Sequence, residues 1–322
     1  MYDERMGSGK TALIVHGGAL KSAYAGGFIS KLGTLGIRAF DYVVGTSASV
    51  GNVAYYATGQ YEDIRNVWIE TIGGNLDFVS VRRWLAGRPP FDVPYLLEVI
   101  RRKTPLDVGR MSESASTVLL PMYNYKKKRH EYFSNRDRDA RERIWDALTV
   151  GMTVHGEHIV CKGEDCYVDT EIEPYAIYRD SPFRDAQHVL IVTNHVVLDF
   201  DVQKKLGNWL FRTIQNGHFP LEVIELLKRR SAITRRNLAL LDDFCKERDV
   251  LIHSPSQSVG IRPWTLVDGG KENIRHLFHE GERAAERVVR GSESRELMGT
   301  LISRSKVLEA RKYVTRIDAL VS

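Results

Sequence analysis

The sequence predicts an α/β fold, in which a mostly parallel central sheet is covered by helices on both faces. Two short apolar runs carry this prediction, because residues 12–15 and 40–44 each lead directly into a glycine-containing turn, as strands buried in a parallel sheet do. A segment with helical periodicity, residues 21–35, joins them. A strand, a helix and a second strand in this order predict the βαβ unit of α/β proteins.

The helix expected over residues 21–35 has its apolar positions at helical spacing, and Gly36 is placed to end it. Gly26 and Gly27 lie inside this helix, where a glycine costs up to about 1 kcal/mol relative to alanine, so we expect close packing on the sheet. A second helix is expected over residues 50–58. The later elements expected are a hairpin of residues 117–123 and 129–133, strands over residues 188–193 and 250–253, and helices over residues 93–102, 141–148, 202–213, 220–229, 234–248 and 272–290.

The domain organisation is expected to be simple, with one folded unit. The chain shows no internal repeat, no low-complexity tract and no linker rich in proline, glycine and serine. We therefore expect a flexible N-terminal segment over residues 1–10, a single α/β domain over residues 11–290, and a helical C-terminal tail over residues 291–322.

The composition is typical of a soluble globular protein, with 43% hydrophobic and 27% charged residues. The net charge of +5 suits an anionic surface but is too small to indicate nucleic-acid binding. No apolar run approaches the roughly 18 residues that cross a bilayer, and residues 1–10 lack the apolar core of a secretory signal. The three cysteines, Cys161, Cys166 and Cys245, are too few for a disulfide framework, so we expect free thiols and a cytoplasmic location.

The turn after the second strand has the sequence of a nucleophile elbow. Gly45-x-Ser47 lies between a strand and a helix, where a sharp turn lifts the serine hydroxyl above the sheet edge. The free N–H groups at the N-terminus of the helix favour negative charge there. The last position of the usual G-x-S-x-G pattern is Ser49, which is small but is not glycine. The alternative interpretation is that Ser47 only caps the helix at a tight turn.

A second loop of small residues follows the first strand. It reads His16-Gly17-Gly18-Ala19-Leu20-Lys21-Ser22, and such residues let the backbone turn sharply and present consecutive N–H groups, as an oxyanion hole requires. The alternatives are an ordinary strand–helix loop and a nucleotide phosphate loop. The G-x-G-x-x-G pattern of the latter is not satisfied, because Ala19 and Ser22 occupy its later glycine positions.

Together, the two loops resemble the motifs of the patatin-like phospholipases, in particular the bacterial cytoplasmic group. That family has G-G-G-x-R-G after its first strand, G-x-S-x-G after the next strand, and D-G-G or D-G-A much later. Here the first motif reads Gly17-Gly18-Ala19-Leu20-Lys21-Ser22 and the second reads Gly45-Thr46-Ser47-Ala48-Ser49. Segments 80–85, 91–96 and 104–107 extend the resemblance, which covers about residues 11–290. It implies a three-layer α/β/α sandwich with helical additions at the C-terminus.

The resemblance also implies a Ser–Asp dyad that works without histidine, and two aspartates compete for its second place. Asp169, in Tyr167-Val168-Asp169-Thr170, precedes the strand over residues 188–193, as the aspartate of the family's Y-V-D-G-G motif precedes a buried strand. Asp268 belongs to the one literal D-G-G of the chain but follows the last expected strand. We choose Asp169. For either residue the alternative is an exposed aspartate at a turn.

The activity implied by the resemblance is that of a serine lipid acyl hydrolase, which cleaves acyl esters through an acyl-enzyme and needs no cofactor and no metal. The expected substrate is a phospholipid or another acyl ester, with peripheral contact at the inner membrane surface and no nucleic-acid partner. The site residues implied are the catalytic pair Ser47 and Asp169, the oxyanion-hole residues Gly17, Gly18 and Ala19, and the supporting residues Lys21 and Gly45.

Five positions depart from the family's motifs: Ala19, Lys21, Ser22, Ser49 and Thr170. Ala19 keeps its N–H but disfavours the positive φ that glycine allows, and Lys21 lacks the planar fork of arginine. Ser49 and Thr170 are expected to crowd turns that usually need glycine. The alternative function is therefore a catalytically impaired patatin-like fold that binds lipid or protein.

Two other motifs compete for the catalytic interpretation. A Ser-His-Asp triad would recruit a histidine such as His16 or His195, but its serine normally follows several strands, and only one strand precedes that of Ser47. Residues 7–11 read G-S-G-K-T and partly match a P-loop. They lack its first glycine and precede a strand instead of following one, so we exclude it.

Three polar segments have alternative binding roles. The spacing of His155, His158, Cys161 and Cys166 could ligate zinc, but a polar loop or hairpin with free thiols is the preferred interpretation. The basic run 126–130 could contact anionic lipid or nucleic acid, or form only a solvated hairpin tip. Residues 82–85 mix arginine with apolar residues, as an interfacial helix does and as a partly buried surface segment also does.

Overall fold

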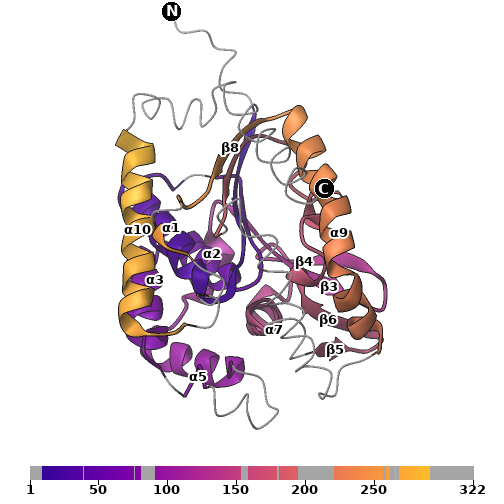
Figure 1. Ribbon diagram of the computed structural model, residues 1–322, viewed down its shortest axis with the longest axis horizontal. Coiled ribbons are helices and arrows are strands. Elements are labelled where there is room, and N and C mark those ends of the chain that lie inside the picture. The colour runs from indigo at the N-terminus through magenta and orange to yellow at the C-terminus, as the bar shows by residue number, and fades with distance from the viewer. Residues whose placement is uncertain are drawn as a thin grey trace, which may run out of the picture.

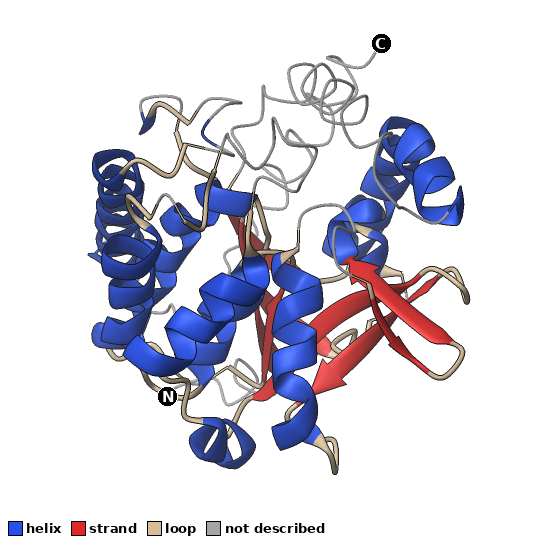
Figure 2. Ribbon diagram, turned by 90° about the horizontal axis from the view of Figure 1, so that it is seen from below, coloured by secondary structure: helices blue, strands red, loops and turns tan. Residues whose placement is uncertain are grey.

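The computed structural model describes residues 9–38, 40–75, 77–80, 91–153, 159–179, 181–194, 221–256, 259–261, 265 and 268–290. Of the N-terminal segment expected over residues 1–10, residues 1–8 lie outside these described residues, whereas Lys10 begins a strand. The helix expected over 202–213, the tail over 291–322 and segment 82–85 also lie outside them. What is described forms an eight-stranded mixed sheet with helices on both sides (Figures 1 and 2). The α/β architecture predicted from the sequence is confirmed.

The parallel part of the sheet is built around β1, Lys10–Val15. This strand pairs with β2, Tyr42–Gly45, along one edge and with β7, Ala186–Val192, along the other. Beyond β2 lies β3, Thr117–Asn124, and beyond β7 lies β8, Asp249–His253. These pairings are all parallel, so the carboxyl ends of β1, β2 and β7 lie side by side at the same end of the strands.

Three antiparallel strands extend the sheet at the β3 side. β4, Arg129–Ser134, forms the expected hairpin with β3. β6, Asp165–Asp169, also pairs with β3, and β5, Val160–Lys162, pairs with β6 as a short outer strand. The sequence analysis did not predict β5 and β6, because each is short and neither has a long apolar run.

The helices form two layers around the sheet. One face carries α1 (Ser22–Thr34), α2 (Ser49–Ala57) and α7 (Ala140–Met152), which share a hydrophobic core with the sheet, and α10 (Lys271–Arg290) packs beside α1. The opposite face is covered by α9 (Leu221–Lys246), as Figure 1 shows. The remaining helical segments are η2 (Ala19–Lys21), α3 (Tyr61–Arg65), the π-helical η3 (Asn66–Ile72), α5 (Val93–Lys103), α6 (Val108–Glu113), η5 (Thr170–Ile172) and η6 (Ala176–Tyr178).

The long helix α9 corrects one prediction. Separate helices over residues 220–229 and 234–248 were expected, whereas the structure has one continuous helix, Leu221–Lys246. The sequence between the two expected helices, residues 230–233, is Arg-Ser-Ala-Ile and contains neither proline nor glycine. No residue there stops a helix, so it continues through the polar interruption.

Helices α1 and α10 approach each other at two glycines. A Cβ atom on Gly27 would lie 1.9 Å from the carbonyl oxygen of Phe278, and one on Gly281 would lie 2.0 Å from the carbonyl oxygen of Tyr24. The close packing expected for Gly27 is therefore present, but its partner is a second helix and not the sheet. The intrinsic cost of the glycine is offset by this contact between helices.

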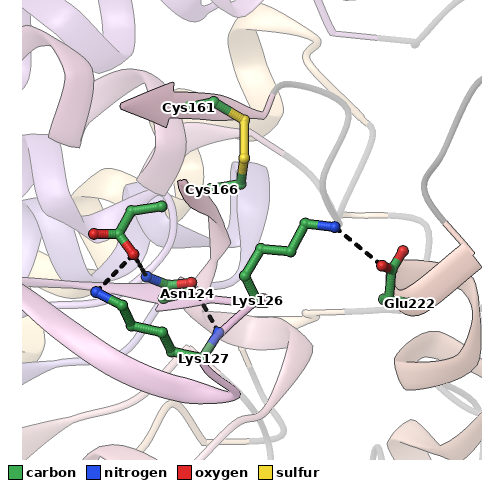
Figure 3. Close-up of a disulfide and its surroundings, with 7 residues drawn as sticks. Asn124, Lys126, Lys127, Cys161, Cys166 and Glu222 are labelled. Atoms are coloured by element: carbon green, nitrogen blue, oxygen red, sulfur yellow. Dashed lines mark hydrogen bonds and ion pairs between the residues drawn. A yellow bond between two sulfur atoms is a disulfide. The ribbon is translucent and has the colours of Figure 1, made fainter. Parts of the chain in front are cut away.

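The β5–β6 hairpin is closed by a disulfide between Cys161 and Cys166, which lie directly opposite each other (Figure 3). The expectation of free thiols at these two positions is therefore wrong, and it fails because the strand pairing that brings them together was not predicted. The argument for a reducing compartment from free thiols is lost with it. Cys245 is a free, buried thiol.

The basic hairpin tip between β3 and β4 is partly neutralised by acidic neighbours. Lys126 Nζ lies 3.0 Å from a Glu222 carboxylate oxygen, and Lys127 Nζ lies 2.6 Å from Asp165 Oδ1 (Figure 3). Both pairs are substantially exposed, so each contributes little to stability. The run therefore forms the hairpin tip, with residues 126–129 exposed, whereas the ring nitrogens of His130 are buried.

Among the described residues, Leu35 is the one exposed large hydrophobic side chain. No helix in the described ranges combines the length and the hydropathy that a membrane span requires.

The contact between α1 and α10 generates a stability prediction. Gly27→Ala is expected to lower the free energy of unfolding by about 2–3 kcal/mol, because the added methyl group requires the α10 backbone to move. Denaturant titration measures this change. Gly109→Ala is the control: Gly109 lies in α6, where a Cβ atom would meet only the Asp107 carboxylate, at 3.2 Å. That variant is expected to be neutral or slightly stabilising. Unchanged unfolding of Gly27→Ala would contradict the packing.

Candidate active site

Ser47 occupies the tight turn between β2 and α2. Its φ is +48°, in the left-handed region that a non-glycine residue seldom adopts. The turn is fixed by hydrogen bonds from Thr46 N–H to the Val15 carbonyl and from Val50 N–H to the Ser47 carbonyl. Such a strained turn is what the nucleophile-elbow pattern predicts, and it places the Ser47 side chain at the carboxyl ends of β1 and β2.

Asp169 reaches this place from the opposite direction, along β6. Leu119 of β3 pairs with both β2 and β4, and Met122 of β3 pairs with both β4 and β6. Since β4 pairs with one edge of β3 from Leu119 to Asn124, β2 and the antiparallel β6 share the other edge. Their carboxyl ends therefore face each other, and Asp169 is the last residue of β6.

The two side chains form a hydrogen bond. Ser47 Oγ donates to Asp169 Oδ2 at 2.9 Å. The other carboxylate oxygen, Asp169 Oδ1, accepts a hydrogen bond from Glu171 N–H at 3.2 Å. Both side chains are shielded, since Ser47 is 8% and Asp169 is 2% exposed. The carboxylate is thus oriented by the backbone and is available at Oδ2 to the serine proton.

The competing partners of Ser47 lie elsewhere. Asp268 is exposed, and its carboxylate accepts a hydrogen bond from the nearby Gly270 N–H. His16 Nε2 forms a 2.6 Å hydrogen bond with the Tyr178 hydroxyl, in the layer beneath α9. Burial lowers the pKa of His16 to about 4. Among the described residues, Asp169 is the only side chain that is hydrogen-bonded to Ser47 Oγ, and His195 lies outside them.

The loop after β1 lies against the Ser47 turn. A Cβ atom on Gly17 would lie 2.2 Å from the Cβ of Ser47, so this position accepts only glycine. The Gly17 N–H donates to Thr46 Oγ1 at 2.9 Å and is therefore unavailable to an oxyanion, contrary to the expectation. For Gly18 and Ala19, no acceptor of their N–H groups occurs within the described structure. These two are the donors that remain from the predicted set.

Lys21 and Gly45 help to fix the conformation of these two loops. Lys21 is completely buried, and its backbone N–H donates to the Gly18 carbonyl at 3.1 Å, which closes the loop. Gly45 ends β2, and a Cβ atom there would lie 2.7 Å from the Ser49 carbonyl oxygen. Neither residue is hydrogen-bonded to Ser47 Oγ.

An apolar pocket opens beside Ser47. It lies between α2, η3, α5 and α7 and has a narrow free interior of about 50 Å³. Its lining includes two polar groups whose partners are internal: Trp68 Nε1 donates to Asn52 Oδ1 at 2.6 Å, and the Tyr55 hydroxyl donates to the Thr104 carbonyl. Apart from Ser47, the pocket therefore presents mainly hydrocarbon. Further lining residues are Ala48, Gly51, Leu97, Trp145, Leu148 and Met152.

Zinc binding at Cys161 and Cys166 is incompatible with the disulfide, because the paired sulfurs are not thiolate ligands. Over the described ranges, no group of three or more His, Cys, Asp or Glu side chains is arranged to hold a metal ion. His155 and His158 lie outside those ranges.

The comparisons with known proteins bear on this geometry. Residues 13–154 match the family described as patatin-like phospholipase. These residues are therefore similar to that family, and we call them the patatin-like region. The patatin-like region contains Ser47 and the loop after β1, whereas Asp169 lies beyond its end. The match supports a lipid acyl hydrolase in general terms.

Two further comparisons give no information on the site. A search of the curated proteins gives no match. Among solved structures, the crystal structure of VipD from Legionella pneumophila is 12% identical to this chain, with a TM-score of 0.39. The match covers 96% of this chain and 75% of that of VipD.

Two departures from the patatin-like motifs turn out to add hydrogen bonds. Ser49 Oγ donates to the His16 carbonyl at 2.9 Å, and Thr170 Oγ1 donates to the Pro121 carbonyl at 2.6 Å. The expected crowding is absent, because each hydroxyl points to a backbone carbonyl and forms a hydrogen bond with it.

Three further residues complete the site but were not selected in the sequence analysis. Thr46 accepts the Gly17 N–H and donates to Glu171 Oε1 at 3.3 Å, which links the two loops to the end of β6. Asn194, just after the end of β7, donates a hydrogen bond to the loop after β1. Thr46 could have been identified from the sequence, because it lies next to Ser47 in the elbow motif. Glu171 and Asn194 belong to no motif.

Ala19 is the departure that remains strained, since its φ is +49°. Ala19→Gly is expected to raise the free energy of unfolding by about 0.5–1 kcal/mol, because alanine costs roughly 1–2 kcal/mol in this conformation and the freedom of unfolded glycine cancels part of the gain. Denaturant titration measures the change. Ala57→Gly, in α2 and without positive φ, should instead destabilise. Equal losses in both variants would contradict the strain at Ala19.

Proposed function

We propose that the protein is a serine lipid acyl hydrolase of the patatin-like type, which cleaves acyl esters through Ser47, Asp169 and an acyl-enzyme. The observation that carries the proposal is the 2.9 Å hydrogen bond between Ser47 Oγ and Asp169 Oδ2 at the edge of an apolar pocket. A nucleophile hydrogen-bonded to a base, next to free backbone N–H groups, is the arrangement that acyl transfer requires.

The acylation step uses the residues in the order of their contacts. Ser47 Oγ attacks the ester carbonyl carbon while Asp169 Oδ2 takes the hydroxyl proton. The carbonyl oxygen becomes an oxyanion, for which the N–H groups of Gly18 and Ala19 are the available donors. The ester C–O bond then breaks, the leaving alkoxide takes the proton from Asp169, and the acyl group remains on Ser47.

The deacylation step repeats this chemistry with water. Asp169 accepts a proton from a water molecule, whose oxygen attacks the acyl carbon of the Ser47 ester. When the second tetrahedral intermediate collapses, the proton returns to Ser47 Oγ and a fatty acid leaves. A free aspartate with a pKa of about 3.9 is a poor base for a hydroxyl, so the shielding of the pair from water is part of the proposal.

The pocket supports an acyl chain as the group that is transferred. Because Asn52, Trp68 and Tyr55 satisfy their polar groups internally, the lining offers a hydrocarbon chain favourable burial and offers a polar substituent no partner. We therefore place the acyl part of a phospholipid or another acyl ester there.

The cellular setting is part of the same proposal. The cytoplasmic location rests on the resemblance to the bacterial cytoplasmic group alone, since Cys161 and Cys166 form a disulfide. There the protein would meet its substrate at the inner membrane surface, and the net charge of +5 favours an anionic lipid surface. A nucleic-acid partner is not part of the proposal, because this charge is small for such a function.

The direct test is labelling with a fluorophosphonate probe together with hydrolysis of a soluble ester. We expect wild type to label and Ser47→Ala not to label. Asp169→Asn keeps the shape of the side chain but removes the base, and should lower kcat/KM by roughly 1,000-fold. The matched control is Asp268→Asn, which changes an exposed aspartate and should leave both readouts unchanged.

Two outcomes would contradict the proposal. Labelling that persists in Ser47→Ala would assign the reactive group to another residue. A folded wild type that neither labels nor hydrolyses the ester would favour the alternative, a patatin-like fold that binds lipid or protein without cleaving it.

A further inference from the structure

The loop after β1 is held by a buried side chain that no catalytic step uses. Asn194 follows the end of β7, the neighbour of β1, and is completely buried. Its Nδ2 donates to the His16 carbonyl at 2.5 Å and contacts the Gly17 carbonyl at 3.4 Å. Its Oδ1 accepts the Ala25 N–H of α1 at 3.1 Å. One side chain thus ties the loop to the start of the helix that follows it.

The peptide group between His16 and Gly17 is fixed at both ends. Its carbonyl oxygen accepts hydrogen bonds from Asn194 Nδ2 and from Ser49 Oγ, and its N–H donates to Thr46 Oγ1. A trans peptide is planar, so fixing both of its polar groups fixes the orientation of the plane. The backbone at the entrance of the loop therefore has one orientation.

The next peptide group carries the first proposed oxyanion donor. In a trans peptide the carbonyl and the N–H point in opposite directions. The contact between the Gly17 carbonyl and Asn194 therefore turns the Gly18 N–H away from Asn194. Gly18 packs closely against Asn194, because a Cβ atom there would lie 3.1 Å from the Cβ of Asn194.

This support has a particular use in this chain. The third loop position is Ala19 at a φ of +49°, where the family motif has a glycine that would adopt this conformation without strain. A strained backbone persists only where its surroundings determine it. Asn194 supplies such a constraint, and Ser49 adds a second contact to the same carbonyl oxygen.

We propose that Asn194 is a positioning residue for the oxyanion loop: it orients the Gly18 and Ala19 N–H groups through the carbonyl oxygens of His16 and Gly17, with Ser49 as its partner. This inference rests on the proposed hydrolase function. It predicts that the loss of Asn194 lowers the rate of the chemical step more than it weakens substrate binding.

The test compares Asn194→Ala with a matched buried asparagine. Asn135 is 4% exposed, donates through Nδ2 to the Met111 and Ser116 carbonyls, and accepts the Val118 N–H through Oδ1. Asn135→Ala removes the same kinds of hydrogen bond away from the site. We expect similar drops in Tm for both variants, but a kcat about 10- to 100-fold lower only for Asn194→Ala, with KM changed less than about twofold.

A second pair of variants, Ser49→Ala and its control Ser30→Ala, tests the same inference if Asn194→Ala does not fold. Ser49→Ala removes one donor to the His16 carbonyl, and Ser30→Ala removes a similar buried hydrogen bond, from Ser30 Oγ to the Tyr61 carbonyl at 2.8 Å. Ser49→Ala should lower kcat and the rate of fluorophosphonate labelling by about 3- to 10-fold, and Ser30→Ala should not.

The outcomes separate this inference from the function on which it rests. An active wild type with a normal kcat in a folded Asn194→Ala or in Ser49→Ala overturns the positioning role and leaves the hydrolase proposal standing. Equal losses of kcat in Asn194→Ala and Asn135→Ala also overturn it, because stability alone then explains the effect. A wild type without labelling and without hydrolysis overturns both.

Discussion

The hydrogen bond between Ser47 and Asp169 depends on a single feature of the sheet, the shared edge of β3. The parallel strand β2 occupies the first half of that edge and the antiparallel strand β6 occupies the second half. Two strands that run toward each other along one edge must end face to face. The serine turn after β2 and the aspartate at the end of β6 are thereby brought to 2.9 Å although 122 positions separate them in the chain.

Around this pair, positions that are glycine in the resembled motifs carry a side chain in this protein. Ser49 and Thr170 donate to the His16 and Pro121 carbonyls, so both turns gain hydrogen bonds instead of steric conflict. Ala19 is different, because its methyl group forms no hydrogen bond and its φ is positive. The loop after β1 is correspondingly held from outside, by Thr46 and by Asn194. Within the described residues, the Gly18 and Ala19 N–H groups of this loop have no acceptor.

Elements with strong local patterns could be predicted from the sequence, and elements fixed by distant pairing could not. The strand over residues 12–15 and the helix over residues 21–35 were predictable, because apolar periodicity and glycine turns define them locally. The β5–β6 hairpin was not, and the disulfide between Cys161 and Cys166 was missed with it. For the site, Ser47 followed from the nucleophile-elbow pattern and Asp169 from the resemblance. The hydrogen bond of the Gly17 N–H to a threonine hydroxyl is a tertiary contact that no motif encodes.

The central claim, that Ser47, the loop after β1 and the apolar pocket act as one acyl-transfer site, is tested most directly by a crystal structure of the protein inhibited with a long-chain alkyl fluorophosphonate. We predict a covalent bond from phosphorus to Ser47 Oγ, with the phosphoryl oxygen about 2.7–3.1 Å from the Gly18 and Ala19 nitrogens. The alkyl chain should lie between α2, α5 and α7. An adduct on another residue, or on Ser47 with its oxygen turned away from the loop, would contradict the account.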